Sequence, residues 1–243
     1  MSDIKKVLVI NGSPKKQGSS TMKATYAFLE GLKMISECEI EIVNVSDLNI
    51  KPCLGCLSCW GHTPGECVIK DDDALIMKHK IEDADIVIES YPLYFFGMPG
   101  IMKVFTDRMM PMMMTYRGQT PPHNGESFHG IRNPKEGQKL VIISSCAYTD
   151  ATHVYDSLIK EYDFICGKDN YTMILLPQLK TLIDLKNENK ISRHLKMVKH
   201  AGELFMTNGS LTKEEIMSLR KPPFTEGAYK IFLDNFWTEE KNK

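Results

Sequence analysis

The sequence predicts a three-layer α/β/α sandwich, in which helices cover both faces of a five-stranded parallel sheet. Short, β-branched apolar runs alternate with longer segments of helical periodicity along most of the 243 residues, as in doubly wound sheets. Several runs are almost continuously apolar, which is typical of strands buried on both faces. The loops that follow the runs carry glycine, proline and hydroxyl side chains.

Five segments have the character of strands. The first, KKVLVIN, is apolar and β-branched and is ended by Gly12. The second, EIEIVNV, alternates apolar and polar residues, which is the period of a strand. The expected strands are residues 5–11, 39–45, 85–91, 139–146 and 170–177.

Helices are expected between and after these strands. In the first of them, four apolar residues fall near one face: Met22, Tyr26, Leu29 and Leu32. The expected helices are residues 19–35, 72–84, 100–110, 151–166 and 191–207. With right-handed crossovers, a ligand would lie beyond the carboxyl ends of the strands, where the strand order reverses. Residues directly after each strand are therefore the candidates for function.

The composition argues against several classes of protein. A formal net charge of -1 does not fit a nucleic-acid binder, which usually carries a basic surplus. No apolar run approaches the roughly 20 residues that cross a bilayer. The start, MSDIKKVLVING, lacks the features of a signal peptide. We therefore expect a cytoplasmic protein without membrane or nucleic-acid partners, in a compartment that keeps thiols reduced.

The chain is expected to form one α/β domain with an extension. The domain covers residues 1–208, and residues 209–243 are aromatic enough to predict a helical extension that packs on the body or on a partner subunit. Residues 109–137, rich in Met, Pro and Gly, predict a loop or an oligomer contact. Together these segments predict a homodimer or homotetramer.

The segment NGSPKKQGSST, residues 11–21 and here called the phosphate loop, follows the first strand and opens the first helix. Gly12 and Gly18 permit tight turns. Ser19, Ser20 and Thr21 can cap the helix, and a helix N-terminus also binds anions. The segment matches neither a Walker A nor a dinucleotide motif. It suits a monophosphate ester or, alternatively, a capped helix without a ligand.

Two further loops suit a flat ring. SYPLYFFGMPG, residues 90–100, contains a run of three aromatic residues at a strand end, where they cannot all face the core. This loop is expected either to line an aromatic ligand or to plug the space between helices. SSCAYTD, residues 144–150, ends the fourth strand with small residues and Tyr148, which is also compatible with the edge of a ligand.

A phosphate loop combined with ring-binding loops describes a site for flavin mononucleotide (FMN). The sequence resembles the NADPH-dependent FMN reductase family of the flavodoxin-like fold over roughly residues 4–208, through NGSPKKQGSST, ADIVIESYPLYFFGMPGIMKVFTDR and KLVIISSCAY. This resemblance implies the strand order 2-1-3-4-5, with FMN where the order reverses. It implies phosphate contacts by Ser13, Ser19, Ser20 and Thr21, and ring contacts by Pro92, Leu93, Tyr94, Phe95, Ser145 and Cys146.

Four cysteines crowd residues 52–68, here called the cysteine loop, with the spacing C-x2-C-x2-C-x7-C: Cys53, Cys56, Cys59 and Cys67. Four thiolates on a short loop can hold a [4Fe–4S] cluster. Structural zinc more often uses two separated pairs or adds histidine, and His62 lies within the loop. A cluster, zinc, and thiols with a structural or redox role are all open. The spacing is similar to the compact motif of iron–sulfur flavoproteins, and this resemblance implies a cluster that exchanges electrons with FMN.

The expected function is that of an FMN-dependent NAD(P)H oxidoreductase that passes electrons to a small-molecule or protein acceptor. Because the flavin carries the redox chemistry, no catalytic acid–base residue is expected. The alternative is a non-enzymatic iron–sulfur flavoprotein that carries electrons between protein partners. A third interpretation is a zinc-stabilised module without flavin.

Overall fold

Five parallel strands form one sheet in the order β2-β1-β3-β4-β5. The computed structural model describes residues 4–116, 127–149, 151–186 and 188–241. It confirms the predicted fold class and strand order, and each predicted strand matches an observed one to within two residues at either end. The strands are β1 (Lys5–Asn11), β2 (Cys38–Asn44), β3 (Ile86–Pro92), β4 (Lys139–Cys146) and β5 (Thr172–Pro177).

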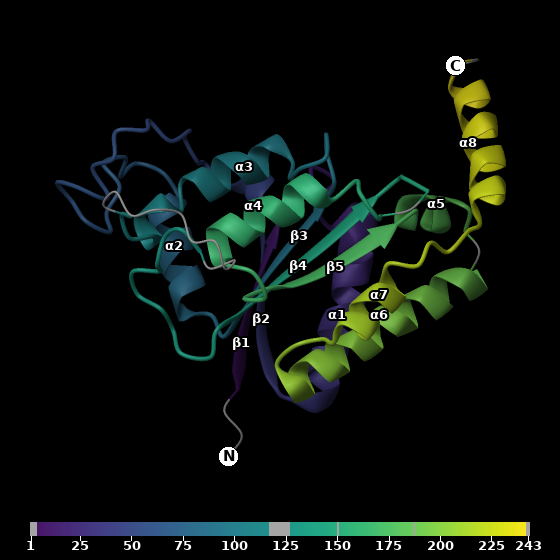
Figure 1. Ribbon diagram of the computed structural model, residues 1–243, viewed down its shortest axis with the longest axis horizontal. Helices are drawn as coiled ribbons and strands as arrows, with labels where there is room; N and C mark the ends of the chain where they lie inside the picture. Colours follow the sequence, from purple (N-terminus) through teal and green to yellow (C-terminus); the bar gives the residue numbers. More distant parts are fainter. Residues whose placement is uncertain (1–3, 117–126, 150, 187, 242–243) are drawn as a thin grey trace.

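Helices cover both faces of this sheet (Figure 1). On one face lie α1 (Ser20–Ile35), α5 (Leu179–Asp184), α6 (Glu188–Asn208) and α7 (Lys213–Leu219); on the other lie α2 (Ala74–Asp83), α3 (Gly100–Asp107) and α4 (Asp156–Cys166). The last helix, α8 (Glu226–Lys241), extends from the body beyond the carboxyl ends of the strands. Three short 3-10 helices are η1 (Lys16–Gly18), η2 (Val45–Asp47) and η3 (Met110–Met112).

Each face of the sheet has its own apolar core. Alternate residues of β1 point to opposite sides, so that Val7 and Val9 pack with α1 and α6, whereas Leu8 and Ile10 pack with α2, α3 and α4. This alternation follows from the two-residue period of a strand. It explains why the central strands are almost continuously apolar.

Helices α1 and α6 cross in backbone contact. A Cβ atom on Gly31 would lie 1.9 Å from the carbonyl oxygen of Lys199, and one on Gly202 would lie 2.2 Å from that of Phe28. No side chain fits at either position, because such distances are far below van der Waals contact. Two glycines therefore determine how closely α6 packs against α1.

Two hydroxyl pairs join α1 to the sheet beneath it. The Oγ1 of Thr21 lies 2.6 Å from the Oγ of Ser145 in β4, and the Oγ1 of Thr25 lies 2.8 Å from the Oγ of Ser90 in β3. All four side chains are buried. Because buried hydroxyls are costly without a partner, these pairs fix the position of the first two turns of α1.

The C-terminal segment returns to the carboxyl edge of the sheet. The hydroxyl of Tyr229 donates to the carbonyl of Ala147 at 2.6 Å, and the N–H of Phe224 donates to Gln178 at 3.0 Å. Most of α8 is nevertheless exposed, including Phe236 and Trp237. Residues 117–126 of the predicted loop or oligomer contact lie outside the described residues. In the described ranges no helix combines the length and apolar character needed to cross a bilayer.

A carboxyl group lies between β3 and α4. Glu89 accepts a hydrogen bond from the Tyr162 hydroxyl, which lies 2.7 Å from the Tyr91 hydroxyl. Burial raises the pKa of Glu89 to about 7, although the bond from Tyr162 opposes the shift. The carboxyl is therefore largely protonated in the folded protein at pH 6, where the unfolded chain would be ionised.

Because of this carboxyl, we expect the free energy of unfolding to fall as the pH rises. The carboxyl has a folded pKa of about 7 and an unfolded pKa of about 4.3. Its preference for the protonated form therefore stabilises the fold fully at pH values below the unfolded pKa. That contribution is lost as the pH rises to the folded pKa, and it amounts to about 4 kcal/mol. E89Q keeps an acceptor for Tyr162 but cannot ionise, so denaturant melts from pH 5 to 8 should be flatter than for wild type. Parallel pH profiles for the two proteins would contradict this assignment.

Candidate functional site

Three loops meet at the carboxyl edge of the sheet. They follow β1, β3 and β4, which are neighbours in the sheet, and in parallel strands the loops that follow lie on one edge. The structure thus brings the predicted phosphate residues close to the loop after β4, since Thr21 contacts Ser145. The N–H of Leu93 donates to the Ser145 carbonyl at 2.8 Å, which joins the loop after β3 to the same place.

In the phosphate loop, backbone N–H groups occupy acceptor sites of two hydroxyls but leave the hydroxyl protons available. The N–H of Lys15 donates to the Oγ of Ser13 at 3.3 Å, and the N–H of Thr21 donates to the Oγ of Ser19, the N-cap of α1, at 3.2 Å. A hydroxyl both donates and accepts, so each proton can still point at an anion. Among the described residues no group forms a hydrogen bond with the Ser20 hydroxyl, and this residue is partly exposed.

The backbone of this loop turns differently from the expectation. Neither Gly12 nor Gly18 has a positive φ; the left-handed residue is Lys16, at 48°. Gly12 is needed for packing, because a Cβ atom there would lie 3.0 Å from the sulfur of Met102 in α3. The Lys16 ammonium pairs with Asp47. Hydroxyls and amides, rather than this lysine, are therefore the groups the loop offers to an anion.

The loop after β3 forms a tight hairpin of residues 94–97, here called the aromatic hairpin. The N–H of Tyr94 donates to the Gly97 carbonyl at 2.9 Å, and the N–H of Gly97 donates back at 3.0 Å. The two central residues, Phe95 and Phe96, have φ of 48° and 63°, a conformation that usually takes Asn or Gly. The Phe95 side chain is fully exposed. Strained, exposed aromatic residues of this kind are typical of ligand-binding loops.

The remaining predicted ring contacts lie deeper. Pro92 ends β3 and Leu93 is partly buried, while the side chains of Ser145 and Cys146 are both buried. Ser145 bonds to Thr21 on the α1 face, and Cys146 packs into the core on the α4 face. Tyr148, just beyond, stacks on Phe96 with ring centroids 5.7 Å apart. The exposed rings at this edge therefore come from the aromatic hairpin and Tyr148.

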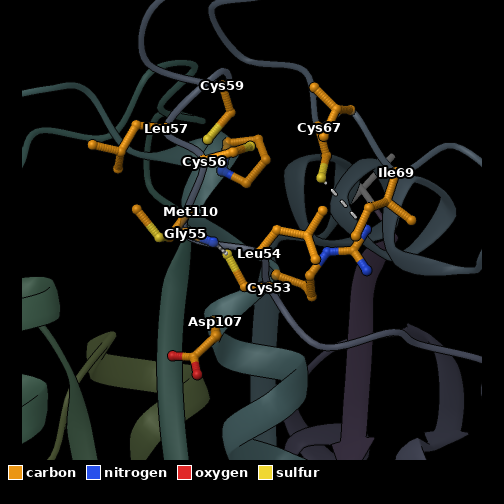
Figure 2. Close-up of a pocket in the computed structure, with 13 residues that line it drawn as sticks. Cys53, Leu54, Gly55, Cys56, Leu57, Cys59, Cys67, Ile69, Asp107 and Met110 are labelled. Atoms are coloured by element: carbon orange, nitrogen blue, oxygen red, sulfur yellow. Dashed lines mark hydrogen bonds between the residues drawn. The ribbon is translucent and has the colours of Figure 1, made fainter.

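The four thiols of the cysteine loop surround one hollow beside the C-terminal end of α3. Figure 2 shows Cys67 on one side of this space and Cys56 and Cys59 on the other. Left-handed residues Gly55 and Leu57, with φ of 64° and 57°, turn the backbone around it. The indole of Trp60 donates to the Met110 carbonyl at 3.2 Å and lies against His129, so this ring holds the loop to the body.

Several N–H groups point at these sulfur atoms. The N–H of Gly55 donates to Cys53 at 3.5 Å, and a hydrogen bond from the Ser58 backbone lowers the pKa of the Cys56 thiol. Burial, and then the charge of Cys67, raises the pKa of the Cys59 thiol. The thiols are therefore close enough to influence one another.

One arginine closes the loop at its base. Arg108 is 2% exposed and donates to the carbonyl of Lys51 at 2.7 Å, to the carboxylate of Asp72 and to the sulfur of Cys67 at 3.6 Å. Arg108 ends one of the motifs that carry the family resemblance, but the sequence alone predicts no role for it. Its partners lie 36 to 57 residues away in the chain, so no local pattern could identify it.

The donor set suits a thiolate-bound cluster, although the thiols are not gathered at ligand distance. Within the described ranges no three His, Cys, Asp or Glu side chains stand close enough to hold a metal ion. The loop thiols form no disulfide, and they border the hollow without His62, which is exposed. Four sulfur ligands without a histidine fit an iron–sulfur cluster or a four-cysteine zinc site.

Residues 5–165 match the model of the family described as the flavodoxin-like fold, and the chain belongs to this family. Two curated relatives are iron–sulfur flavoproteins. That of Clostridioides difficile is 34% identical over 113 residues, covering 46% of this chain and 49% of the relative. One from Archaeoglobus fulgidus is 40% identical over 138 residues, covering 54% of this chain and 58% of the relative. The chain thus spans about half the length of the curated relatives it matches.

Solved structures share the fold at low sequence identity. An FMN-dependent NADH-azoreductase from Bacillus anthracis has a TM-score of 0.58 and 20% identity, covering 83% of this chain and 100% of that one. An NAD(P)H:quinone oxidoreductase from Methanothermobacter marburgensis has a TM-score of 0.60 and 18% identity, covering 83% of this chain and 98% of that one. These similarities establish the architecture.

The left-handed backbone of the aromatic hairpin predicts an unusual order of stability for two variants of Phe95. F95G and F95A both remove a side chain that is fully exposed, but only glycine relieves the left-handed backbone. We expect F95G to be more stable than F95A by about 1 kcal/mol, whereas glycine is ordinarily the less stable of the two. Thermal melts of both variants measure the difference. F95A as stable as F95G would show that this turn carries no strain.

Proposed function

We propose that the protein is an FMN-dependent NAD(P)H oxidoreductase that also holds a [4Fe–4S] cluster in its cysteine loop. One observation carries the proposal: α3 reaches both candidate sites, because its Met102 lies against Gly12 of the phosphate loop and Arg108, directly after it, lines the four-thiol hollow. FMN, when bound, supplies the hydride and electron chemistry, and the protein supplies binding, orientation and protection from water. The iron–sulfur names of the curated relatives support the second part.

The phosphate of FMN is assigned to the first turn of α1. The protons of Ser13, Ser19 and Ser20 and the amides of the helix N-terminus would hold it, since the positive end of the helix dipole favours an anion. Thr21 acts differently: its hydroxyl is bonded to Ser145, so it positions the turn. This role is additional to the phosphate contact that the family resemblance implies for Thr21, because a hydroxyl with one hydrogen bond can still make another.

The isoalloxazine ring is assigned to the loops after β3 and β4. Pro92 and Leu93 lead into the aromatic hairpin, where Tyr94 and Phe95 present rings at the edge. Ser145 and Cys146, buried beneath, would support the ring's other side through the backbone. Aromatic side chains stack on flat ligands and exclude water from them. The exposed faces of Phe95 and Tyr148 leave room for a nicotinamide or a planar acceptor.

The cluster is assigned to Cys53, Cys56, Cys59 and Cys67. The N–H groups directed at their sulfur atoms support a cluster, because hydrogen bonds to sulfur stabilise cluster thiolates and set their potential. The position of His62 outside the hollow supports sulfur-only ligation. NAD(P)H is the proposed electron donor, and a small molecule or protein the acceptor.

A homodimer or homotetramer is part of this proposal. Phe236 and Trp237 of α8 are exposed, and aromatic side chains are enriched at protein interfaces. The helical extension of residues 209–243 would then pack on the flavin-binding body at residues 1–208 through α7 and Tyr229, and on a partner subunit through α8.

Anaerobic purification tests the cofactors together. We expect a brown-yellow protein with one FMN and four iron and four sulfide per chain. Adding NADPH or NADH should bleach the flavin absorbance. Bleaching by a reduced ferredoxin but by neither nicotinamide would favour the electron carrier. A colourless protein with stoichiometric zinc, unable to take up added FMN, would refute both.

Two variants separate the sites. S20A removes a hydrogen bond to a charged phosphate, which is worth about 1.5 kcal/mol, and should weaken FMN binding about tenfold without loss of iron. C53A should lose iron and keep FMN. S36A, at the far end of α1, is the matched control and should change neither. Fluorescence titration of FMN and iron analysis measure these effects, and loss of both cofactors in both variants would contradict two separate sites.

A further inference from the structure

Both ends of the cysteine loop meet at one buried ion pair. The N–H of Lys51, just before the loop, donates to Asp72 at 3.0 Å, and Asp72 follows the loop. Arg108, from the end of α3, donates to the Lys51 carbonyl and to both oxygens of Asp72. The arginine and aspartate side chains are each 1% exposed. Breaking one partner of such a pair is costly, because it leaves a buried charge.

The same arginine faces the thiols. It lines the hollow that the four cysteines border, and its Nη2 lies 3.6 Å from the sulfur of Cys67. Its Nε is buried and has no hydrogen-bond partner among the described residues. Buried donors are rarely left unsatisfied, and a guanidinium stays charged in proteins. Arg108 thus closes the loop and lines the hollow, and it still has one N–H donor without a partner among the described residues.

The negative and positive members of this ion pair face different parts of the cysteine loop. Asp72 neutralises the guanidinium, but it contacts the loop ends, whereas an N–H of Arg108 contacts the sulfur of Cys67. The sulfur therefore meets the positive side of the pair. A group that becomes more negative when it gains an electron is stabilised by a nearby positive charge and by N–H donors, so its reduction potential rises.

We propose that Arg108 is a positioning and redox-tuning residue of the cysteine site: it holds the loop closed around the bound group and raises that group's reduction potential through Cys67. The inference rests on the proposed function, since it requires a cluster at the four cysteines. Arg108 itself lies outside the cysteine motif. Asp72 sets the opposing charge.

Opposite substitutions in the ion pair test the proposal. R108Q removes the charge and the fork of donors, and should shift the cluster potential to more negative values. D72N leaves the arginine uncompensated, and should shift it to more positive values. A purely structural role would lower cluster content in both variants without opposite shifts. Spectroelectrochemical titration of the cluster absorbance, with the FMN potential followed in the same sample, gives the measurement.

Second variants keep the test decisive if R108Q folds poorly. R108K retains the charge but loses the bidentate fork. It should release iron to a chelator about ten times faster than wild type, because changes to residues that hold metal ligands in place typically weaken metal binding. R132Q is the matched control. Arg132 packs against Gly65 of the same loop and donates to the Pro111 and Met113 carbonyls, so its loss should leave the cluster potential unchanged.

The outcomes distinguish the cluster assignment from the role of Arg108. Wild-type protein without iron overturns the cluster assignment and the role of Arg108 with it. A wild-type cluster whose potential is the same in R108Q, R108K and D72N overturns the role of Arg108 alone. An equal shift in R132Q would show that any disturbance of the loop moves the potential, and would also refute a specific role for Arg108.

Discussion

The hydrogen bond between the hydroxyls of Thr21 and Ser145 is the contact on which the ligand edge depends. It joins the first turn of α1 to the end of β4, across an interface that excludes water. Thr25 and Ser90 repeat the contact one turn further on, to β3. Because both pairs are buried, the start of the helix cannot rotate without leaving hydroxyls unsatisfied. The loops after three different strands are thereby held in one arrangement before any ligand arrives.

Helix α3 connects the two candidate sites. Its N-terminal end follows the aromatic hairpin, and Arg108, directly after its C-terminal end, closes the cysteine loop. Eight helical residues span about 12 Å. Met102, in the same helix, packs against Gly12 at the start of the phosphate loop. One short helix therefore touches the phosphate loop, the aromatic hairpin and the cysteine loop.

The strands and the site loops could be predicted because their signals are local. A β-branched run such as residues 5–11 shows its strand character in consecutive residues. The spacing of the four cysteines is likewise visible within one short segment. The roles of Ser145 and Arg108 depend instead on contacts between distant segments. Ser145 was expected at the ligand and is bonded to Thr21, 124 residues away. Helix α5 was missed because it starts from Gln178, a buried left-handed residue that no propensity would place there.

The glycine contact between α1 and α6 has a consequence for the distant start of α1. Gly31 and Gly202 lie far from the carboxyl edge along their helices, and they set the distance between α1 and α6. Any side chain at either position would push the two helices apart. Because α1 is stiff, part of that displacement would reach its first turn. A substitution at either site would therefore disturb the proposed phosphate loop as well as the packing around the glycines.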